Sequence, residues 1–395
     1  MLSPTNQAAA IYAFTGLGFS GANLILAKLL PPRDYAELAL VVSILGVAAP
    51  LAPLGADGII NRRLLGPSRR LLGRACATAA VVAALAALAS RTLYGLDLVL
   101  LGALVPGLFA GGVVMVAAAG FQRFQRFTPA LLIDQSANLF LIGASLLMIL
   151  PALRVVWFPV ALIAIGYTAT AALGWTALFR QHADPGAPEP PFPWGEALYY
   201  AGVSGAGLLL LQAERLLIPR VLSMEDLASF GVLAAVVIAP YRTLQMGATF
   251  SVLPRLRALA SPAERRRLLW HEVLGLGLAV AVGSAVLILL APWVFELIFG
   301  DKFRFPSELI LAAVLAGIAR VLGGLAEGAA TALCTTRELG VLNVLTWLST
   351  AVAFVAGSVG ARWGLIGLVY GIAIGWITLA AVYAHRVLPH LRTED

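Results

Sequence analysis

Three arginines, Arg215, Arg242 and Arg320, interrupt long apolar stretches of a 395-residue chain that is 60% hydrophobic and only 12% charged. A guanidinium keeps its charge in a protein, and placing one at the centre of a bilayer costs about 2.5–3.5 kcal/mol on insertion scales. Such residues usually face a water-filled cavity or a partner inside a helical bundle. The sequence therefore predicts a membrane protein with a cationic interior. An anionic cargo fits it, because guanidinium groups bind phosphate through charge-assisted hydrogen bonds.

Two of these arginines have polar neighbours at helical spacing. Gln212 lies three residues before Arg215, and Gln245 and Thr249 lie three and seven residues after Arg242. Residues at these spacings share one face of a helix. We interpret both faces as cargo-binding surfaces. The alternatives are that Arg215 pairs with a carboxylate that joins two helices, and that Arg242 extends to the membrane interface.

The third arginine shares a helix face with a carboxylate. Arg320, Gly324 and Glu327 lie on one side of the segment, where glycines allow close approach of another backbone or of a cargo. Arg320 either contacts the cargo or is neutralised by Glu327. Glu214, next to Arg215, points to another face of its helix. We treat Glu214 and Glu327 as candidates for ion coupling.

The N-terminal half has no intramembrane arginine but offers other polar residues. Asn23 would make a cavity polar, and Asp57 and Asp134 are candidates for coupling to H⁺ or Na⁺, because buried carboxylates of transporters often serve this role. For Asp134 we favour a cytoplasmic-end residue paired with Arg123 or Arg126, with ion coupling as the alternative.

The elements that carry these residues must be membrane helices. The mean hydropathy of +0.91 excludes an ordinary soluble domain, and a spanning helix needs about 20 apolar residues. About twelve segments qualify, near 8–30, 36–56, 72–93, 97–119, 129–150, 156–179, 197–221, 227–250, 270–292, 307–333, 339–360 and 363–386. We expect an all-α polytopic membrane protein whose short loops leave no room for a catalytic domain.

Motifs for catalysis and metal binding are missing from the sequence. The two cysteines, Cys76 and Cys334, lie in apolar stretches without a disulfide or metal-type spacing. The four histidines lie in loops or at helix ends and predict no ligand cluster. Neither a phosphate-binding GxxxxGK[ST] loop nor G-x-S-x-G or H-E-x-x-H occurs. The sequence predicts no enzyme, no metal site and no cofactor.

The positive charges of the loops predict an orientation. With the N-terminus in the cytoplasm, the inside loops hold 16 Lys and Arg and the outside loops hold 8, which with the three intramembrane arginines makes all 27. This bias predicts an even number of spans and two cytoplasmic termini. The basic loops also explain the basic isoelectric point. We expect them to contact anionic lipid headgroups and not nucleic acid.

The sequence repeats itself once. The stretch 27–40 reappears as 219–232, where Lys28 matches Arg220 and Asp34 matches Asp226, each 192 positions later. Twice this offset is nearly the whole chain, which indicates a two-fold repeat.

A proline-rich stretch separates the two halves. Five prolines fall in residues 184–193, a composition typical of a linker. The predicted organisation is an N-lobe of six helices (1–183), a cytoplasmic linker (184–194) and a C-lobe of six helices (195–395). Six helices in each lobe give both lobes the same orientation, as in transporters with parallel repeats.

Nearly the whole chain resembles the polysaccharide and O-antigen flippases (Wzx type) of the MATE/MOP exporter superfamily. The segments that carry the resemblance are 26–64, 210–256, 289–303 and 360–377. In that family the seventh helix commonly carries an acidic residue followed by arginine, which Glu214 and Arg215 match here. The lipid II flippases of the superfamily have two extra helices, for which this chain is too short.

The resemblance implies a function. A polyprenyl-diphosphate-linked oligosaccharide would move from the cytoplasmic to the periplasmic leaflet of the bacterial inner membrane, by rocking of 1–180 against 195–395. The diphosphate would be held by the three arginines, in a cavity made polar by Gln212, Gln245 and Asn23. Glycosyltransferases or a polysaccharide polymerase would be partners. The alternatives are a MATE-type cation or drug antiporter, and a non-transporting scaffold of a glycan-assembly complex.

Overall fold

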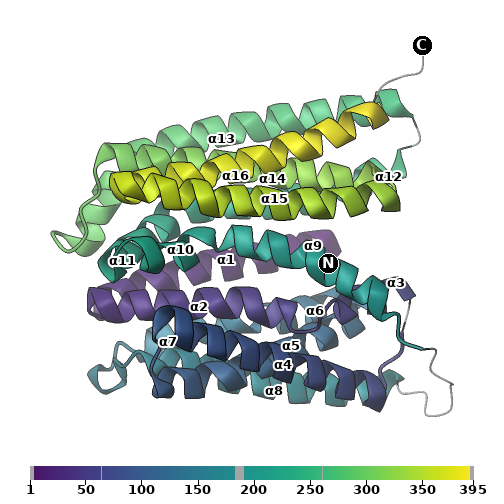
Figure 1. Cartoon of the computed structure of the whole chain (residues 1–395), viewed down its shortest axis with the longest axis horizontal. Coiled ribbons are helices and arrows are strands. Elements are labelled where there is room, and N and C mark those ends of the chain that lie inside the picture. Colours follow the sequence, from purple (N-terminus) through teal and green to yellow (C-terminus); the bar gives the residue numbers. More distant parts are fainter. Residues whose placement is uncertain (1–3, 64, 183–190, 260, 392–395) are drawn as a thin grey trace. The chain divides into compact units, whose positions relative to one another are not determined.

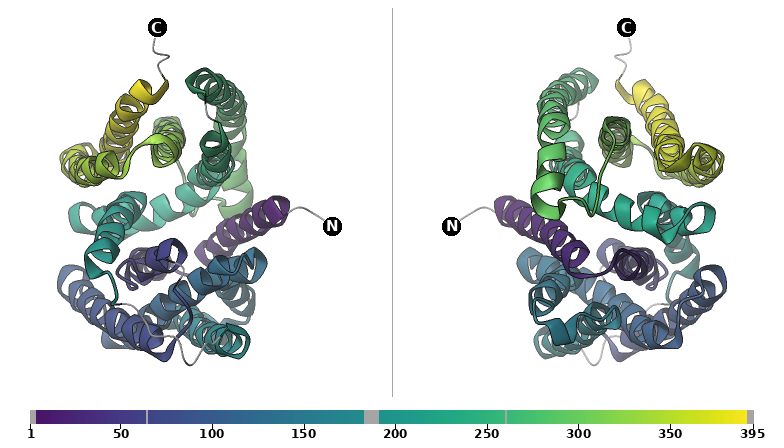
Figure 2. Two further views of the ribbon diagram at one scale, coloured as in Figure 1. Left: turned by 90° about the vertical axis from the view of Figure 1, so that its right-hand side faces the viewer. Right: turned by 90° about the vertical axis from the view of Figure 1, so that its left-hand side faces the viewer.

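The computed structural model describes residues 4–63, 65–182, 191–259 and 261–391. Within these ranges the regular structure is helical and contains no strand (Figure 1). Contacts divide the chain into two compact units, Met1–Arg220 and Val221–Asp395. Within each unit the long helices are bundled with their axes roughly aligned, as the end-on views show (Figure 2).

Unit 1 consists of ten helices in the described residues. They are α1 (Pro4–Leu29), α2 (Pro32–Leu51), α3 (Ala56–Arg63), α4 (Arg69–Tyr94), α5 (Leu98–Arg123), α6 (Phe127–Asp134), α7 (Ser136–Leu147), α8 (Trp157–His182), α9 (Trp194–Leu211) and α10 (Ala213–Val221). A 3₁₀ turn, η1 (Pro151–Leu153), precedes α8.

Unit 2 begins with a helix that contains a π-helical turn and continues with four long helices. They are α11 (Met224–Leu233), η2 (Ala234–Ile238), α12 (Ala239–Ala258), α13 (Pro262–Phe299), α14 (Ser307–Leu333), α15 (Thr336–Gly360) and α16 (Gly364–Val387). The 3₁₀ turns η3 (Ala361–Trp363) and η4 (Leu388–Leu391) flank α16.

The helices are long and apolar enough for a multi-pass membrane protein. Eight described stretches could cross a membrane, or up to ten if each of two bent pairs is one span. One stretch, Arg337–Leu391, contains both α15 and α16. Counting these separately and adding the 26-residue α1 gives twelve helices of sufficient length, which agrees with the sequence prediction.

Local sequence sets the ends of these helices. The hydroxyl of Ser68 accepts the N–H of Leu71 at 3.0 Å and starts α4. That helix ends at Gly95, whose left-handed φ of 66° disfavours residues with a side chain. Asp97 then accepts the N–H of Leu100 at 2.7 Å and starts α5. Each polar cap satisfies a backbone donor that the first helical turn leaves open.

One helix rich in small residues packs inside each unit. In unit 1, Gly111 of α5 is so close to α2 and α8 that a methyl group would lie 2.8 Å from Ala49 and 3.0 Å from Tyr167. In unit 2, a methyl group on Gly317 of α14 would overlap the ring of Tyr241 on α12. Without side chains at these points, neighbouring helices approach closely and gain packing contacts.

The outer helices present apolar side chains to their surroundings. In the most apolar 18-residue stretch of α13 only 11% of the residues are buried. Leu278, Leu289 and Trp293 are among the exposed side chains of this helix. In water such a surface would be unfavourable. It therefore faces lipid.

The helix boundaries extend the repeat that the sequence indicates. The ends of α1 and α10, at Leu29 and Val221, are 192 positions apart. The same offset separates the starts of α2 and α11. The offset is 209 between the starts of α5 and α14 and of α6 and α15, because α13 has 38 residues where α4 has 26 and the following loop is also longer; between α8 and α16 it is 207. Each half therefore contains six corresponding spans.

The division into units falls elsewhere than the predicted linker. α9 and α10 follow the linker in sequence, but α9 packs on α2 and α3 and belongs to unit 1. The predicted lobes 1–183 and 195–395 rest on the repeat and stay a prediction. Residues 184–190 of the linker lie outside the described residues.

Candidate functional site

The helix that carries Arg215 is broken in the middle. α9 and α10 meet at Gln212 with a bend of 58°. The break places Gln212 on α2, where a methyl group on Gly46 would lie 3.1 Å from the Gln212 side-chain nitrogen. Irregular backbone at membrane depth is tolerated where protein or a water-filled cavity surrounds it. Gln212 is therefore a buried polar side chain at an interruption of the helix, as a binding residue in a transporter would be.

Arg215 itself lies one turn beyond the break. Its side chain is partly exposed, and its charge acts on the phenol of Tyr35, which is fully buried on α2. The Tyr35 hydroxyl has no hydrogen-bond partner among the described residues. Glu214, next to Arg215, is 1% exposed. Glu214 therefore lies on the packed side of α10, and Arg215 lies at its edge.

Both ends of the broken helix are held within unit 1. At the start of α9, Glu196 forms ion pairs with Arg62 at 2.8 Å and Arg63 at 2.9 Å. In α10, Tyr94 donates a hydrogen bond to the carbonyl of Leu216 at 3.0 Å, and near the end of the helix Arg220 donates to the carbonyl of Leu93 at 2.5 Å. The sequence analysis did not find these anchors, because they join residues more than 100 positions apart.

In unit 2 the buried arginine stacks on an aromatic ring. Arg320 of α14 is 5% exposed, and its guanidinium carbon lies 5.6 Å from the centroid of Trp376 on α16. The next turn brings Gly323 against the same ring, at 3.0 Å from an added methyl group. A cation over an aromatic face is attracted by about 2 kcal/mol or more when desolvated. Trp376 thus offsets part of the cost of burying the charge.

The predicted polar face of α12 also lies against α14. The side chain of Gln245 packs on Gly324, where an added methyl group would lie 2.8 Å from its amide nitrogen. Arg242 is partly exposed, three residues earlier on the same helix. The side chain of Thr249, the third member of this face, lies outside the described residues. Gln245 and Arg320 therefore belong to two helices in direct contact.

The carboxylate that would neutralise Arg320 does not pair with it. Glu327 is partly exposed on α14 and forms no ion pair in the described part of the chain. The two residues are seven positions apart on α14. Glu327 stays a candidate for ion coupling.

The carboxylates of the N-terminal half lie in two local environments. Asp134 ends α6 where α6 and α7 bend by 51°, and Gln135 donates a hydrogen bond to its carboxylate at 2.6 Å. Thr15 of α1 and Asn138 of α7 donate to the same Gln135 oxygen at 3.3 and 2.8 Å. The expected partners, Arg123 and Arg126, make no ion pair with Asp134 in the described residues. The Asp134 carboxylate is thus bound by the neighbouring amide of Gln135 and not by either arginine, and its role in ion coupling stays a prediction.

Asp57 lines a small cavity at the break between α2 and α3. The cavity measures about 50 Å³, and its wall is formed by Pro50, Leu51, Gly55, Asp57, Gly58, Tyr200, Ala201 and Ser204. The backbone bends here through Leu54 and Gly55, both at positive φ. A cavity of this volume is large enough for water, which needs about 10–15 Å³. Asn23, the remaining predicted residue, is buried and donates to the carbonyl of Phe19 on its own helix at 2.8 Å.

The predicted residues are thus divided between the two units. Unit 1 contains Asn23, Asp57, Asp134, Gln212, Glu214 and Arg215, and unit 2 contains Arg242, Gln245, Arg320 and Glu327. A common cluster of the three arginines stays a prediction. Within unit 2, the contact of α12 with α14 is the feature that brings predicted residues together.

Solved structures with this arrangement of helices are transporters and a flippase. An inward-facing multidrug resistance MATE family transporter of the MOP superfamily superposes with a TM-score of 0.64 and 14% identity, over 98% of this chain and 100% of that chain. The lipid II flippase MurJ, in an inward closed conformation, gives 0.65 and 12%, over 96% and 87%. This chain has the MATE and MurJ fold.

A eukaryotic MATE transporter matches equally along its length, with a TM-score of 0.60 and 14% identity over 98% of both chains. No protein-family model and no curated protein sequence matches the chain, so the likeness is one of fold. These neighbours are transporters and a flippase, not enzymes, which agrees with the sequence prediction. The chain shares the fold of these proteins, and its helices are long and apolar enough for a multi-pass membrane protein.

Proposed function

We propose that this chain is a flippase for a polyprenyl-diphosphate-linked oligosaccharide, moved from the cytoplasmic to the periplasmic leaflet of a bacterial inner membrane. The observation that carries the proposal is Arg320, a permanent charge that is 5% exposed within a membrane helix. Arg215 and Arg242 add two more guanidinium groups in membrane-spanning helices. A diphosphate offers these groups charge-assisted hydrogen bonds, which offset the free-energy cost of burying the guanidinium charges. The Wzx-type resemblance of the sequence supports the glycan as cargo.

In this proposal the polar amides line the path of the sugar. Gln212 at the helix break and Gln245 on α12 offer both donors and acceptors, as does Asn23. The polyprenyl tail stays in lipid while the two repeats rock to expose the site on either side. Both termini are cytoplasmic, and glycosyltransferases or a polysaccharide polymerase supply or consume the glycan.

Coupling to H⁺ or Na⁺ would use the buried carboxylates. Asp57 lines a cavity that is large enough for a cation with water, and Asp134 lies in an amide network. Replacing either carboxylate by its amide removes the charge but keeps the shape. We expect the Asp57→Asn variant to lose the stimulation by an ion gradient and to keep binding of the glycan.

A reconstituted flipping assay tests the main proposal. Proteoliposomes with a fluorescent polyprenyl-diphosphate glycan would be compared for wild type and for Arg215→Ala, Arg242→Ala and Arg320→Ala. We expect each variant to slow flipping at least about tenfold, since losing one charge-assisted hydrogen bond costs about 1.5–3 kcal/mol. Arg304→Ala is the matched control, because Arg304 is exposed in a loop beside Asp301. Flipping that survives in all three variants would refute the role of the arginines.

A second candidate is a MATE-type cation antiporter. It is favoured by Glu214, which is 1% exposed in α10 and would attract a cation. This candidate predicts efflux of a cationic dye that Glu214→Gln abolishes, with no flipping of the glycan. If the chain is a non-transporting scaffold, we expect neither activity. Glycan assembly in cells should then continue in each of the three arginine variants.

A further inference from the structure

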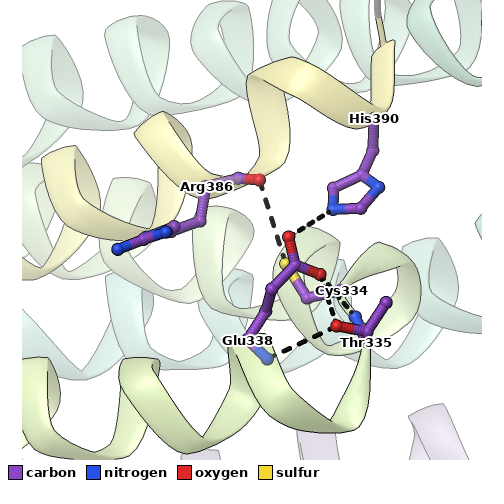
Figure 3. A network of polar contacts seen from close by, with 5 residues as sticks. All are labelled: Cys334, Thr335, Glu338, Arg386 and His390. Carbon is purple, nitrogen blue, oxygen red and sulfur yellow. Dashed lines mark hydrogen bonds and ion pairs between the residues drawn. The ribbon is translucent and has the colours of Figure 1, made fainter.

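Three potential metal ligands of different chemistry converge at one end of unit 2. Cys334 follows α14, Glu338 lies in the first turn of α15, and His390 lies in the 3₁₀ turn η4 after α16. One ligand atom from each lies within 4.8 Å of the other two (Figure 3). The sequence analysis predicted no ligand cluster for the histidines. Folding nevertheless brings His390 next to residues more than 50 positions earlier in the sequence.

The carboxylate of Glu338 is oriented by its own helix terminus. Its Oε2 accepts the backbone N–H of Thr335 at 2.7 Å and the Thr335 hydroxyl at 2.8 Å. This capping box leaves Oε1, which faces the His390 Nε2 at 3.1 Å. Partners of this kind fix the direction of a ligand and are a usual feature of metal sites. One carboxylate oxygen is thus held by the fold, and the other faces His390, where a cation could replace their hydrogen bond.

The remaining ligand is the thiol of Cys334. Its sulfur lies 4.0 Å from the carbonyl oxygen of Arg386, in the last turn of α16. Tetrahedral zinc sites with bonds of about 2.0–2.3 Å have neighbouring ligands about 3.3–3.8 Å apart. The distance between Glu338 Oε1 and His390 Nε2 is 3.1 Å and already near this range. The distances to the Cys334 sulfur are within 4.8 Å and would have to shorten by about 1 Å, which side chains at turns can supply. Sulfur, nitrogen and oxygen donors together favour zinc over magnesium or calcium.

We propose that Cys334, Glu338 and His390 bind one Zn²⁺ ion, with a water molecule or the Arg386 carbonyl as fourth ligand. The ion would join the turn between α14 and α15 to the turn after α16, and so fasten the C-terminal helix to the unit. Binding forms a zinc–sulfur bond and releases the thiol proton of Cys334 to solvent, so affinity rises with pH. The positive-inside bias predicts this end of the helices in the reducing cytoplasm, where cysteine stays a thiol.

Access and charge fit a zinc site. The side chains of Glu338 and His390 are 30% and 25% exposed, so an ion can enter from solvent. With a thiolate and a carboxylate, the three ligands neutralise a divalent ion. The alternative is an ion pair of Glu338 with His390 on top of a capping box, which involves no thiol. The two possibilities differ in whether Cys334 takes part.

A metal-binding titration of the purified full-length protein tests the proposal. Affinity tags of histidine are removed, and Zn²⁺ is titrated against a chromophoric chelator. We expect one ion per chain, and at least about tenfold weaker binding in Cys334→Ser, Glu338→Gln and His390→Ala, as loss of supporting partners alone costs 10–100-fold. Thr335→Ala should weaken binding by about tenfold through the carboxylate it orients. Cys76→Ser and His385→Ala are matched controls and should bind as wild type.

A second measurement needs no variant of the site. Bound Zn²⁺ should slow the alkylation of Cys334 by a maleimide and leave Cys76 unchanged, as read by mass spectrometry of the two peptides. Absence of stoichiometric binding would overturn the proposal. So would binding that the three site variants do not weaken, or alkylation of Cys334 that zinc does not slow. These readouts are independent of transport, so the outcome does not depend on the proposed flippase.

Discussion

At the residue scale, glycines on α16 set how closely α15 can pack. A methyl group on Gly371 would overlap the carbonyl oxygen of Ala356, and one on Gly375 would overlap Ala353. The contacts run in opposite directions along the two helices, so α15 and α16 form an antiparallel pair. Backbone cannot yield as a flexible side chain does. These glycines are therefore places where the fold requires the absence of a side chain.

We expect Gly371→Ala to destabilise the protein by about 1–3 kcal/mol, because α15 and α16 must separate to accept the methyl group. The matched control is Gly283→Ala in α13, where nothing lies within 4 Å of the new atom. There alanine should be neutral or stabilising by up to about 1 kcal/mol. Thermal unfolding in detergent measures both. Equal stability of the two variants would contradict the close packing of α15 on α16.

Single residues of the candidate site could be predicted from the sequence, but their surroundings could not. Arg215, Arg242 and Arg320 are found from sequence, since a charge in an apolar stretch is visible without a structure. Their surroundings are not, because Tyr35 and Trp376 come from distant helices and are ordinary aromatic residues in the sequence. The proximity of His390 to Cys334 and Glu338 was missed for the same reason. Ligand spacing within one segment is a local signal, and these three residues come from three different elements.

At the element scale, the start of α9 is fastened to α3 by charges. Glu196 pairs with Arg62 and Arg63, and Arg62 also donates to the hydroxyl of Tyr200 at 2.6 Å. The arginine side chains are 49% and 59% exposed, so each pair contributes about 0–1 kcal/mol. The pairs are too weak to determine global stability. Their effect should be local, on the first turns of α9.

We expect Glu196→Gln to increase amide hydrogen exchange in the first two turns of α9 and to leave the unfolding temperature within about 2 °C, since exposed pairs contribute so little. Glu308→Gln is the matched control, as Glu308 is an acidic residue in the first turn of α14 without an ion pair in the described residues. Unchanged exchange in α9 would show that helix packing alone holds it.

Helix lengths explain why only part of the repeat was visible in the sequence. The offset of 192 relates Asn23 to Arg215, so the predicted polar residues of the first and seventh spans are repeat partners. Beyond α13 the offset of 209 relates Asp134 to Asn343 and Gly111 to Arg320. A single offset fails there because α13 is 12 residues longer than α4. The second half thus carries its cationic residues where the first has small or neutral ones.

At the scale of the whole molecule, fold class and orientation rest on different evidence. Apolar length predicted the helices, and their arrangement follows from packing between distant segments. The solved MATE and MurJ structures share that arrangement at 12–14% identity, so many sequences satisfy it. Orientation depends on loop charge alone, through the 16 inside and 8 outside basic residues. It is therefore independent of the fold and needs its own test.

Labelling of single cysteines in intact cells tests the orientation. In a Cys76→Ser, Cys334→Ser background, Arg304→Cys lies in the exposed loop between α13 and α14, and Arg337→Cys lies at the exposed start of α15. These positions are at opposite ends of α14. Because the basic loops are retained inside, we expect a membrane-impermeant maleimide to label position 304 from outside and position 337 only after permeabilisation. The reverse labelling pattern would show that the orientation in the membrane is opposite to the predicted one. It would also place Cys334 and His390 on the oxidising side, where thiols are exposed to disulfide formation.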